Sequence, residues 1–212
     1  MENNTNIIVI GYKVNEYVAK LEQECLDSIS ITKNKEYDIT YLDNYTSGLT
    51  LTEAWNKLIF TSKCKNICLL NNDTKIVQPE WLDKLLLPLE KKEVGFTGPS
   101  TNNCHSVQKT IPTLEIANLE EGVQFSKDPL SGFCLCFRKK VWEELKGFDS
   151  RYKLYGQESD FCDRGHRLGY KSVWVKSAFV FHHGEVSVKE SGLNTTKERD
   201  KAKKLYWSER KK

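Results

Sequence analysis

An acidic side chain after a short apolar run is the first feature that could do chemistry. The apolar residues 67–70 are followed by two asparagines and then by Asp73, and the next helical pattern begins at Pro79. A carboxylate in this place could hold a hard cation such as Mg²⁺ or Mn²⁺, which in turn binds a diphosphate. The alternative is an aspartate that caps the following helix, but Pro79 lies six residues away, too far for direct capping. Asp73 is therefore a candidate metal ligand.

Two carboxylates, Glu158 and Asp160, stand two positions apart at the start of a predicted helix. Acidic groups near a helix N-terminus interact favourably with the helix dipole, by roughly 0.3–1 kcal/mol, and Asp160 or Ser159 would also suit the N-cap. The preceding residues 152–156 are aromatic and contain glycine, which would suit a cleft where one carboxylate acts as general base. Spacing alone leaves capping and catalysis equally open.

A histidine pair, His182-His183, closes a strand-like stretch and meets Gly184. Such pairs are more often structural than ligating. A histidine close to a cation-binding carboxylate, however, supplies a nitrogen that suits Mn²⁺ or another first-row ion. The ligand hypothesis therefore requires Asp73 to lie close to this pair in space.

Composition sets limits on the class of protein. The 212 residues are 39% hydrophobic and 29% charged, as in ordinary globular domains, and no apolar run approaches the ~18 residues of a membrane span. The N-terminal residues lack a secretion signal, so we expect a cytoplasmic protein. The seven cysteines include no C-x-x-C pair, which favours reduced cysteines packed as small hydrophobes over a zinc site.

Elements that would position these residues alternate along the first half. Short β-branched or apolar runs predict strands, and apolar residues at helical spacing predict helices. The predicted strands are residues 6–10, 37–42, 67–70 and 94–97; the predicted helices are residues 18–29, 51–60 and a third beginning at Pro79. This order predicts an α/β fold with a mostly parallel, Rossmann-like sheet flanked by helices.

Polar residues follow three of these strands in succession. Gly11, Asp43 and Asp73 come after the first, second and third strand. Each one alone is an ordinary turn former. Parallel sheets, however, bind ligands beyond the carboxyl ends of their strands, and three successive polar ends favour a shared site there.

The second half is organised differently. Residues 101–129 are polar and weakly periodic, which is typical of a binding loop or flap. Strands are predicted at residues 132–138, 172–175 and 178–181, and helices at residues 139–145 and 159–168. Residues 197–212 carry eight basic and three acidic side chains. Their spacing predicts a docked helix with a solvated basic face, although recruitment of a polyanionic acceptor is an alternative.

Several enzyme classes lack their motifs. We find no P-loop, no G-x-G-x-x-G after the first strand and no G-x-S-x-G elbow. A sugar-phosphate nucleotidyltransferase would need a glycine-rich loop with Arg and Lys after the first strand, which residues 11–15 do not provide.

The stretches LLNNDT, GP, GFCLCFR, GFD, YGQESDFC and HHG do occur in order. Together they resemble the family-2 glycosyltransferases with the GT-A fold, over nearly the whole chain.

The resemblance implies an inverting, metal-dependent transfer of a sugar from a nucleotide-diphosphate donor, most commonly a UDP-sugar, to an acceptor hydroxyl. Asp73 would bind Mn²⁺ or Mg²⁺ with His182, or with His183 as the alternative. Glu158 would be the general base, with Asp160 as its competitor. The residues implied in donor binding are Gly11, Tyr12, Asp43, Asn71, Asn72 and Asp73.

Two positions depart from the family pattern. Asn71 replaces the first aspartate of the D-x-D motif, and Gln157-Glu158 replaces Glu-Asp, so the base is one methylene longer. The resemblance implies a single domain: residues 1–100 for the donor, 101–184 for the acceptor and catalysis, and 185–212 as a loop and basic helix. The acceptor could be a polysaccharide, glycolipid, protein or modified nucleic acid. A non-catalytic nucleotide-sugar or carbohydrate-binding module is the alternative function.

Overall fold

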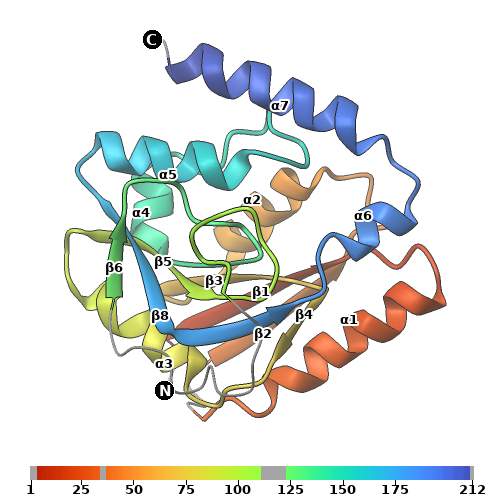
Figure 1. Cartoon of the computed structure of the whole chain (residues 1–212), viewed down its shortest axis with the longest axis horizontal. Helices are drawn as coiled ribbons and strands as arrows, with labels where there is room; N and C mark the ends of the chain where they lie inside the picture. Colours follow the sequence, from red (N-terminus) through yellow and green to blue (C-terminus); the bar gives the residue numbers. More distant parts are fainter. Residues whose placement is uncertain (1–3, 34–36, 111–122, 211–212) are drawn as a thin grey trace.

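The computed structural model describes residues 4–33, 37–110 and 123–210 (Figure 1). Strands and helices alternate through the first half, as the apolar periodicity predicts. The strands are β1 (Thr5–Gly11), β2 (Tyr37–Asp43), β3 (Asn66–Asn71), β4 (Thr74–Ile76), β5 (Val94–Ser100), β6 (Val123–Ser126), β7 (Cys134–Arg138) and β8 (Lys171–His182). The helices are α1 (Glu16–Ile29), α2 (Leu51–Thr61), α3 (Trp81–Leu86), the 3₁₀ turn η1 (Leu87–Glu90), α4 (Lys139–Glu144), α5 (Gln157–Arg167), α6 (Val186–Glu190) and α7 (Thr195–Arg210).

A single sheet of eight strands forms the centre, in the order β2-β1-β3-β7-β5-β8-β4, with β6 beside β8. The α/β class with flanking helices is confirmed, but the sheet is mixed rather than mostly parallel. β1 pairs in parallel with β2 and β3, and β5 pairs in parallel with β8, whereas the other pairings are antiparallel. The described residues between β5 and β7 include β6 but no helix, so the crossover rule does not fix the direction of β7.

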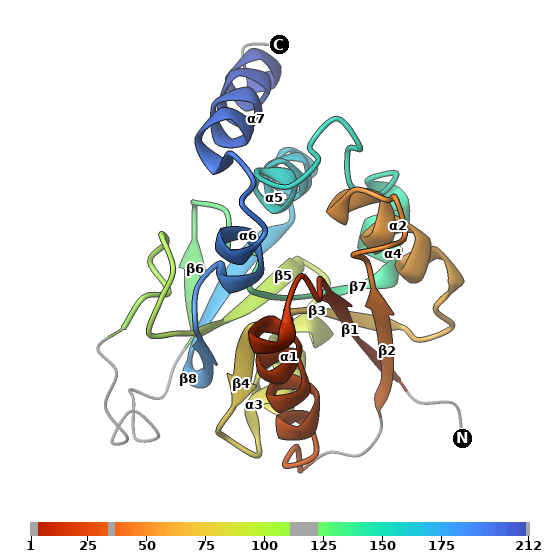
Figure 2. The same ribbon diagram turned by 90° about the vertical axis from the view of Figure 1, so that its right-hand side faces the viewer.

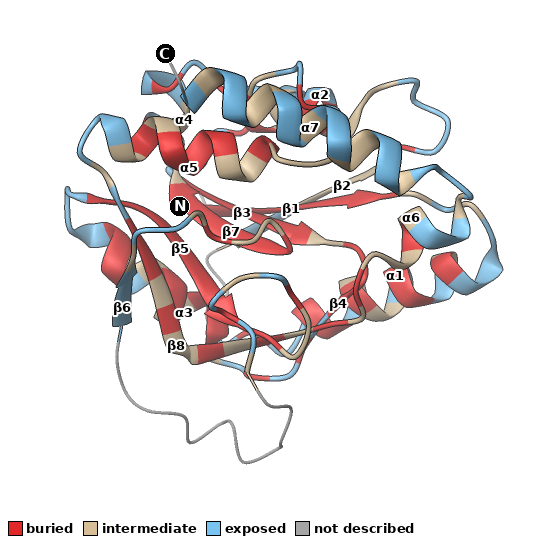
Figure 3. Ribbon diagram, turned by 45° about the horizontal axis from the view of Figure 1, so that its top comes forward, coloured by how far each residue is buried: buried red, intermediate tan, exposed pale blue. Residues whose placement is uncertain are grey.

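Helices cover both faces of the sheet (Figure 2). Alternate residues of β1 point to opposite faces, and all of them are buried. Ile7 and Val9 pack with α1 and α3, whereas Ile8 and Ile10 pack with α2, α4 and α5. The core therefore consists of two apolar layers, one on each face of the sheet, and the central strands are buried (Figure 3). This packing holds the strand ends in place.

Several elements differ from the sequence prediction. The two strands predicted between residues 172 and 181 form one continuous strand, β8, while β4, β6 and α6 were not predicted. Part of the predicted loop at residues 101–129 is β6, and its residues 111–122 lie outside the described part of the chain. The C-terminal helix is present as α7. None of the helices in the described segments combines the length and the apolar character needed to cross a bilayer.

Candidate functional site

The carboxyl ends of β1, β2 and β3 bring the predicted polar residues together. In the parallel register Gly11 pairs with Asp43, and Ile10 pairs with Asn71. Parallel strands end at the same edge of a sheet, so these residues share that edge, as the sequence predicts. Asp73 follows Asn71 by two residues and immediately precedes β4.

Asp73 and His182 meet because β4 pairs with the end of β8. Thr74 is the antiparallel partner of His182, and the Nε2 atom of His182 lies 3.2 Å from Oδ1 of Asp73. The other carboxylate oxygen of Asp73 accepts a hydrogen bond of 3.1 Å from the backbone N–H of Val186. Residues 109 positions apart in sequence thus form one buried polar pair.

The ring of His182 is held in a defined orientation. Its Nδ1 lies 2.6 Å from the carbonyl oxygen of Asn103, and because a carbonyl only accepts, Nδ1 carries the proton and donates. Phe133 stacks on the ring, with centroids 5.2 Å apart. When the ring is neutral, its Nε2 lone pair therefore faces Asp73, and within the described residues this buried Nε2 has no hydrogen-bond partner.

Nε2 of a neutral His182 and Oδ1 of Asp73 are both acceptors, so at 3.2 Å they need a cation or a proton between them. Burial by itself lowers the pKa of His182, but the nearby carboxylate of Asp73 outweighs this effect, and the net pKa is raised. Burial likewise raises the pKa of Asp73, and His182 reverses the effect to a net lowering. The pair therefore attracts positive charge, and its oxygen and nitrogen donors fit a first-row divalent ion.

His183, the alternative ligand, lies differently. Its backbone N–H donates to the carbonyl oxygen of Asp73 at 2.9 Å, while its ring contacts Phe181 edge-on with centroids 5.0 Å apart. Successive side chains alternate along a strand. The structure thus places the His182 ring, rather than that of His183, against the carboxylate of Asp73.

Glu158 lies in the first turn of α5, close to Gly132. A Cβ atom at position 132 would come within 3.2 Å of Cγ of Glu158, so this backbone approach favours glycine. The next residue, Phe133, is the one whose ring stacks on His182. Residues 132–133 thus connect the surroundings of Glu158 with the Asp73–His182 pair. Burial raises the pKa of Glu158, which suits a proton acceptor near neutral pH.

Asp160 is engaged in an ion pair. Its Oδ2 lies 2.7 Å from Nε of Arg164, one helical turn further along α5. The same guanidinium donates to the carbonyl oxygens of Leu145 and Gly147. Asp160 therefore fastens α5 to the end of α4, whereas no basic side chain in the described residues pairs with Glu158.

Glu22 is a buried residue of the site that the sequence interpretation missed. Its carboxylate accepts from the backbone N–H of Tyr12 at 3.1 Å, from the Asn72 amide at 3.0 Å and from the Tyr41 hydroxyl. A Cβ atom at position 11 would approach this carboxylate to 2.4 Å. Glu22 thus ties the ends of β1, β2 and β3 together. The available signal was a glutamate on the buried stripe of α1.

Replacing Glu22 with leucine should destabilise the strand ends. The buried Asn72 amide and the half-buried donors of Tyr12 and Tyr41 would lose their acceptor, and each buried unsatisfied group costs about 1–3 kcal/mol. We expect the free energy of unfolding, measured with urea, to fall by at least about 2 kcal/mol. The matched Glu24→Leu, on a more exposed position of the same helix, should change it by less than about 0.5 kcal/mol. Equal losses in both variants would contradict this role of Glu22.

The other residues predicted to bind the sugar donor differ in how far their side chains are already hydrogen-bonded within the protein. The Asn72 amide donates to both Glu22 and Ser187, so it is used within the protein. Asp43 accepts only a local bond from the backbone of Tyr45 among the bonds seen. The rings of Tyr12 and Tyr45 meet edge-on at 5.3 Å. An aromatic pair and a carboxylate thus flank the ends of β1 and β2.

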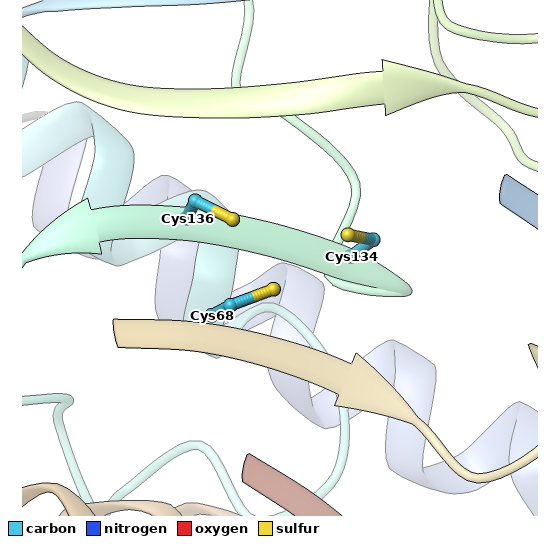
Figure 4. Close-up of side chains that lie close together, drawn as sticks. All are labelled: Cys68, Cys134 and Cys136. Carbon is cyan, nitrogen blue, oxygen red and sulfur yellow. The ribbon is translucent and has the colours of Figure 1, made fainter. Parts of the chain in front are cut away.

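The seven cysteines are all reduced and buried. Cys68, Cys134 and Cys136 place their sulfur atoms within 4.8 Å of one another on neighbouring strands β3 and β7 (Figure 4). These three belong to the apolar layer under α1 and α3, and burial raises the pKa of the Cys68 and Cys134 thiols. Their place in an apolar layer agrees with the predicted packing role.

Comparison with known proteins adds relatives. No family model matches the chain. It is 28% identical over 137 residues to the O-antigen biosynthesis protein RfbC of Myxococcus xanthus, a match that covers 56% of this chain and 11% of the relative. It is 44% identical over 54 residues to an N-acetylglucosaminyl-diphospho-decaprenol L-rhamnosyltransferase of Mycobacterium tuberculosis, covering 26% of this chain and 18% of the relative. The chain thus spans less than a fifth of the length of these relatives.

Solved structures share the fold at low sequence identity. The mannosyltransferase PcManGT from Pyrobaculum calidifontis, in complex with GDP-Man and Mn²⁺, aligns with a TM-score of 0.64 and 13% identity over 86% of this chain and 57% of its own. GalNAc-T7, with UDP, GalNAc and Mn²⁺, aligns with a TM-score of 0.63 and 12% identity over 84% of this chain and 43% of its own. The fold is that of GT-A glycosyltransferases, and together with the sequence relatives it supports a family-2-like glycosyltransferase.

Proposed function

We propose that this protein transfers a sugar from a nucleoside-diphosphate donor to an acceptor hydroxyl, with inversion at the anomeric carbon and with a divalent cation. The observation that carries the proposal is the buried His182 Nε2, which has no hydrogen-bond partner among the described residues and faces Oδ1 of Asp73 at 3.2 Å. A non-catalytic binding module would not need this donor pair together with the half-buried carboxylate of Glu158.

Asp73 and His182 would hold the cation. The nitrogen donor favours Mn²⁺ over Mg²⁺, because Mg²⁺ binds almost entirely through oxygen ligands. The hydrogen bond from His182 Nδ1 to the Asn103 carbonyl fixes the ring, as hydrogen bonds to the second ring nitrogen do for the histidine ligands of metal sites. When bound, the cation would neutralise the negative charge that develops on the departing diphosphate. The Mn²⁺ in both solved relatives supports this choice.

The nucleoside would lie over the ends of β1 and β2. Asp43 offers a carboxylate for ribose hydroxyls or base amino groups, and the Tyr12 and Tyr45 rings offer apolar edges for the base. The absence of a side chain at Gly11 leaves room for the Glu22 carboxylate, which orders this segment. Asn71 would contribute a neutral hydrogen-bonding group. Asn72 would act by positioning, since its amide is already engaged.

Glu158 would remove the proton from the acceptor hydroxyl as that oxygen attacks the anomeric carbon. The new glycosidic bond forms while the bond to the diphosphate breaks, so one displacement inverts the configuration. The raised pKa of Glu158 strengthens it as a base. Asp160 would instead keep α5 in place through Arg164.

For the acceptor we propose a saccharide hydroxyl on a lipid-linked or polymeric carrier. The names of the two sequence relatives, one for O-antigen biosynthesis and one for a sugar carried on diphospho-decaprenol, support this class over a protein or a modified nucleic acid. The exposed lysines of α7, Lys197, Lys203 and Lys204, would favour a carrier with negative charge.

The donor should be identified by thermal unfolding with a panel of UDP-, GDP- and dTDP-sugars, each with and without Mn²⁺. At a concentration 100 times its dissociation constant, a ligand adds about 2.7 kcal/mol of stability, which for a chain of this length raises the Tm by roughly 5–10 °C. We expect this shift from one nucleotide class and only when Mn²⁺ is present. A panel without any Mn²⁺-dependent shift would overturn the proposed donor chemistry.

A further inference from the structure

Helix α7 is attached to the rest of the protein by polar contacts. None of its residues is buried, and it lies along α5 (Figures 1 and 3). The Tyr206 hydroxyl donates to Asp163, Nε of Arg210 lies 2.9 Å from the same carboxylate, and Arg151 reaches Glu209 at 3.0 Å. The apolar edge of the helix, formed by Ala202, Leu205 and Tyr206, is only half-buried, so these polar contacts add to its docking.

One side chain of α7 reaches two different loops. The guanidinium of Arg199 donates to both carboxylate oxygens of Glu185, just before α6. Its Cζ atom also lies 4.9 Å from the ring centroid of Tyr155, just before α5. Both hydrogen bonds come from one nitrogen, Nη2, and the planar guanidinium can at the same time stack its face on an aromatic ring, which an ammonium group cannot.

Each of these loops carries one half of the candidate site. Glu185 adjoins Val186, whose N–H donates to Asp73, and it follows the histidine pair by two residues. Tyr155 precedes Glu158 by three residues. Arg199 thus connects the backbone beside the cation-binding pair with the backbone that leads to the proposed base.

The conformation of Glu185 supports a functional reason for this contact. Its φ angle is +59°, in the left-handed region that a residue with a side chain adopts only at a cost. The following N–H is the one that reaches Asp73. The ion pair with Arg199 holds Glu185 in this conformation, and without it the loop would be free to relax away from Asp73.

We propose that Arg199 is a positioning residue of the transfer site, which fixes the cation-binding loop and the base-bearing loop relative to each other. The proposal deepens the proposed function and rests on it for its catalytic consequence. Arg199 itself contacts neither Asp73 nor Glu158, so its effect on the reaction passes through Glu185 and Tyr155.

Hydrogen exchange of the free protein tests the linkage without any substrate. Arg199→Ala should speed amide exchange at least tenfold in residues 153–158 and in residues 183–187. Arg199→Lys should show most of this effect, because it loses the stacking on Tyr155. The control Arg210→Ala removes another contact of α7, with Asp163, and should leave both segments unchanged. Faster exchange confined to α7 in Arg199→Ala would overturn the linkage.

Kinetics then test the consequence for transfer. We expect Arg199→Ala to lower kcat about 10- to 100-fold and to raise the Mn²⁺ concentration for half-maximal activity several-fold, whereas Arg210→Ala changes neither. Combining Arg199→Ala with Glu185→Gln should add little to the single change, since both break one contact. Additive losses, or a kcat that Arg199→Lys restores fully, would refute the positioning role. If Arg199→Ala shows the expected change in hydrogen exchange but the wild-type protein has no transferase activity, the proposed function is refuted and the linkage between the two loops is not.

Discussion

Asp73→Asn should abolish Mn²⁺-dependent donor binding and lower kcat/KM for transfer by roughly 10³-fold. Asparagine keeps the size of the side chain and an oxygen that can accept from the Val186 N–H, but it removes the charge that faces His182. Direct titration of Mn²⁺, followed by the electron paramagnetic resonance signal of the free ion, would measure the loss. Thermal unfolding without ligand would show that the variant folds.

The control for this variant is the same chemical change elsewhere. Asp27→Asn alters an exposed carboxylate near the end of α1, so Mn²⁺ binding and transfer should stay at the wild-type level. His182→Gln should weaken Mn²⁺ binding as Asp73→Asn does, whereas His183→Gln should have a much smaller effect. Unchanged Mn²⁺ affinity in Asp73→Asn would show that the cation binds elsewhere.

Glu158→Gln should leave donor and Mn²⁺ affinity intact while lowering kcat by roughly 10²–10⁴-fold, the usual contribution of a general base. Glutamine fills the same space beside Gly132 but cannot accept the proton of the acceptor hydroxyl. The measurement is transfer to the acceptor together with donor affinity from thermal shifts. Nuclear magnetic resonance of the product would report the anomeric configuration, which we expect to be inverted.

The pH dependence of the wild-type enzyme should reflect the same carboxylate. Burial raises the pKa of Glu158, and only the ionised form is a base, so kcat should fall as the pH decreases through that raised pKa. The acidic limb should therefore lie at higher pH than for an ordinary exposed glutamate. It should disappear from the residual activity of Glu158→Gln.

Asp160→Asn separates the two carboxylates of α5. It breaks the buried ion pair with Arg164, so we expect a lower Tm with donor affinity and the acidic limb of kcat preserved in the folded fraction. If Asp160→Asn instead lost the acidic limb while Glu158→Gln kept its turnover, Asp160 would be the base.

Most elements of the fold were predictable because their signals are local. The apolar run before Gly11 and the helical spacing of residues 18–29 match β1 and α1 closely. The direction of β7 and the pairing of β4 with β8 depend on partners far along the chain. A three-residue strand such as β4 has too few positions for periodicity to separate it from a turn.

The candidate site was predictable in its residue types but only partly in its surroundings. The resemblance singled out Asp73, Glu158 and His182, and the structure places Asp73 against His182. The Asn103 carbonyl that orients His182 comes from a polar loop without a motif. Glu22 lay within a helical pattern interpreted as apolar. Periodicity shows which side of a helix is buried, but it does not show which hydrogen-bond donors on other elements face that side.

The concealed thiols make this protein convenient for spectroscopy. Since every native cysteine is buried, a single new thiol on the surface, such as Ser208→Cys on α7, would be the preferred target of a maleimide dye or nitroxide. Pairing that label with a second one on α2, at Lys57→Cys, would let interprobe distances follow α7 during turnover without first deleting any natural residue.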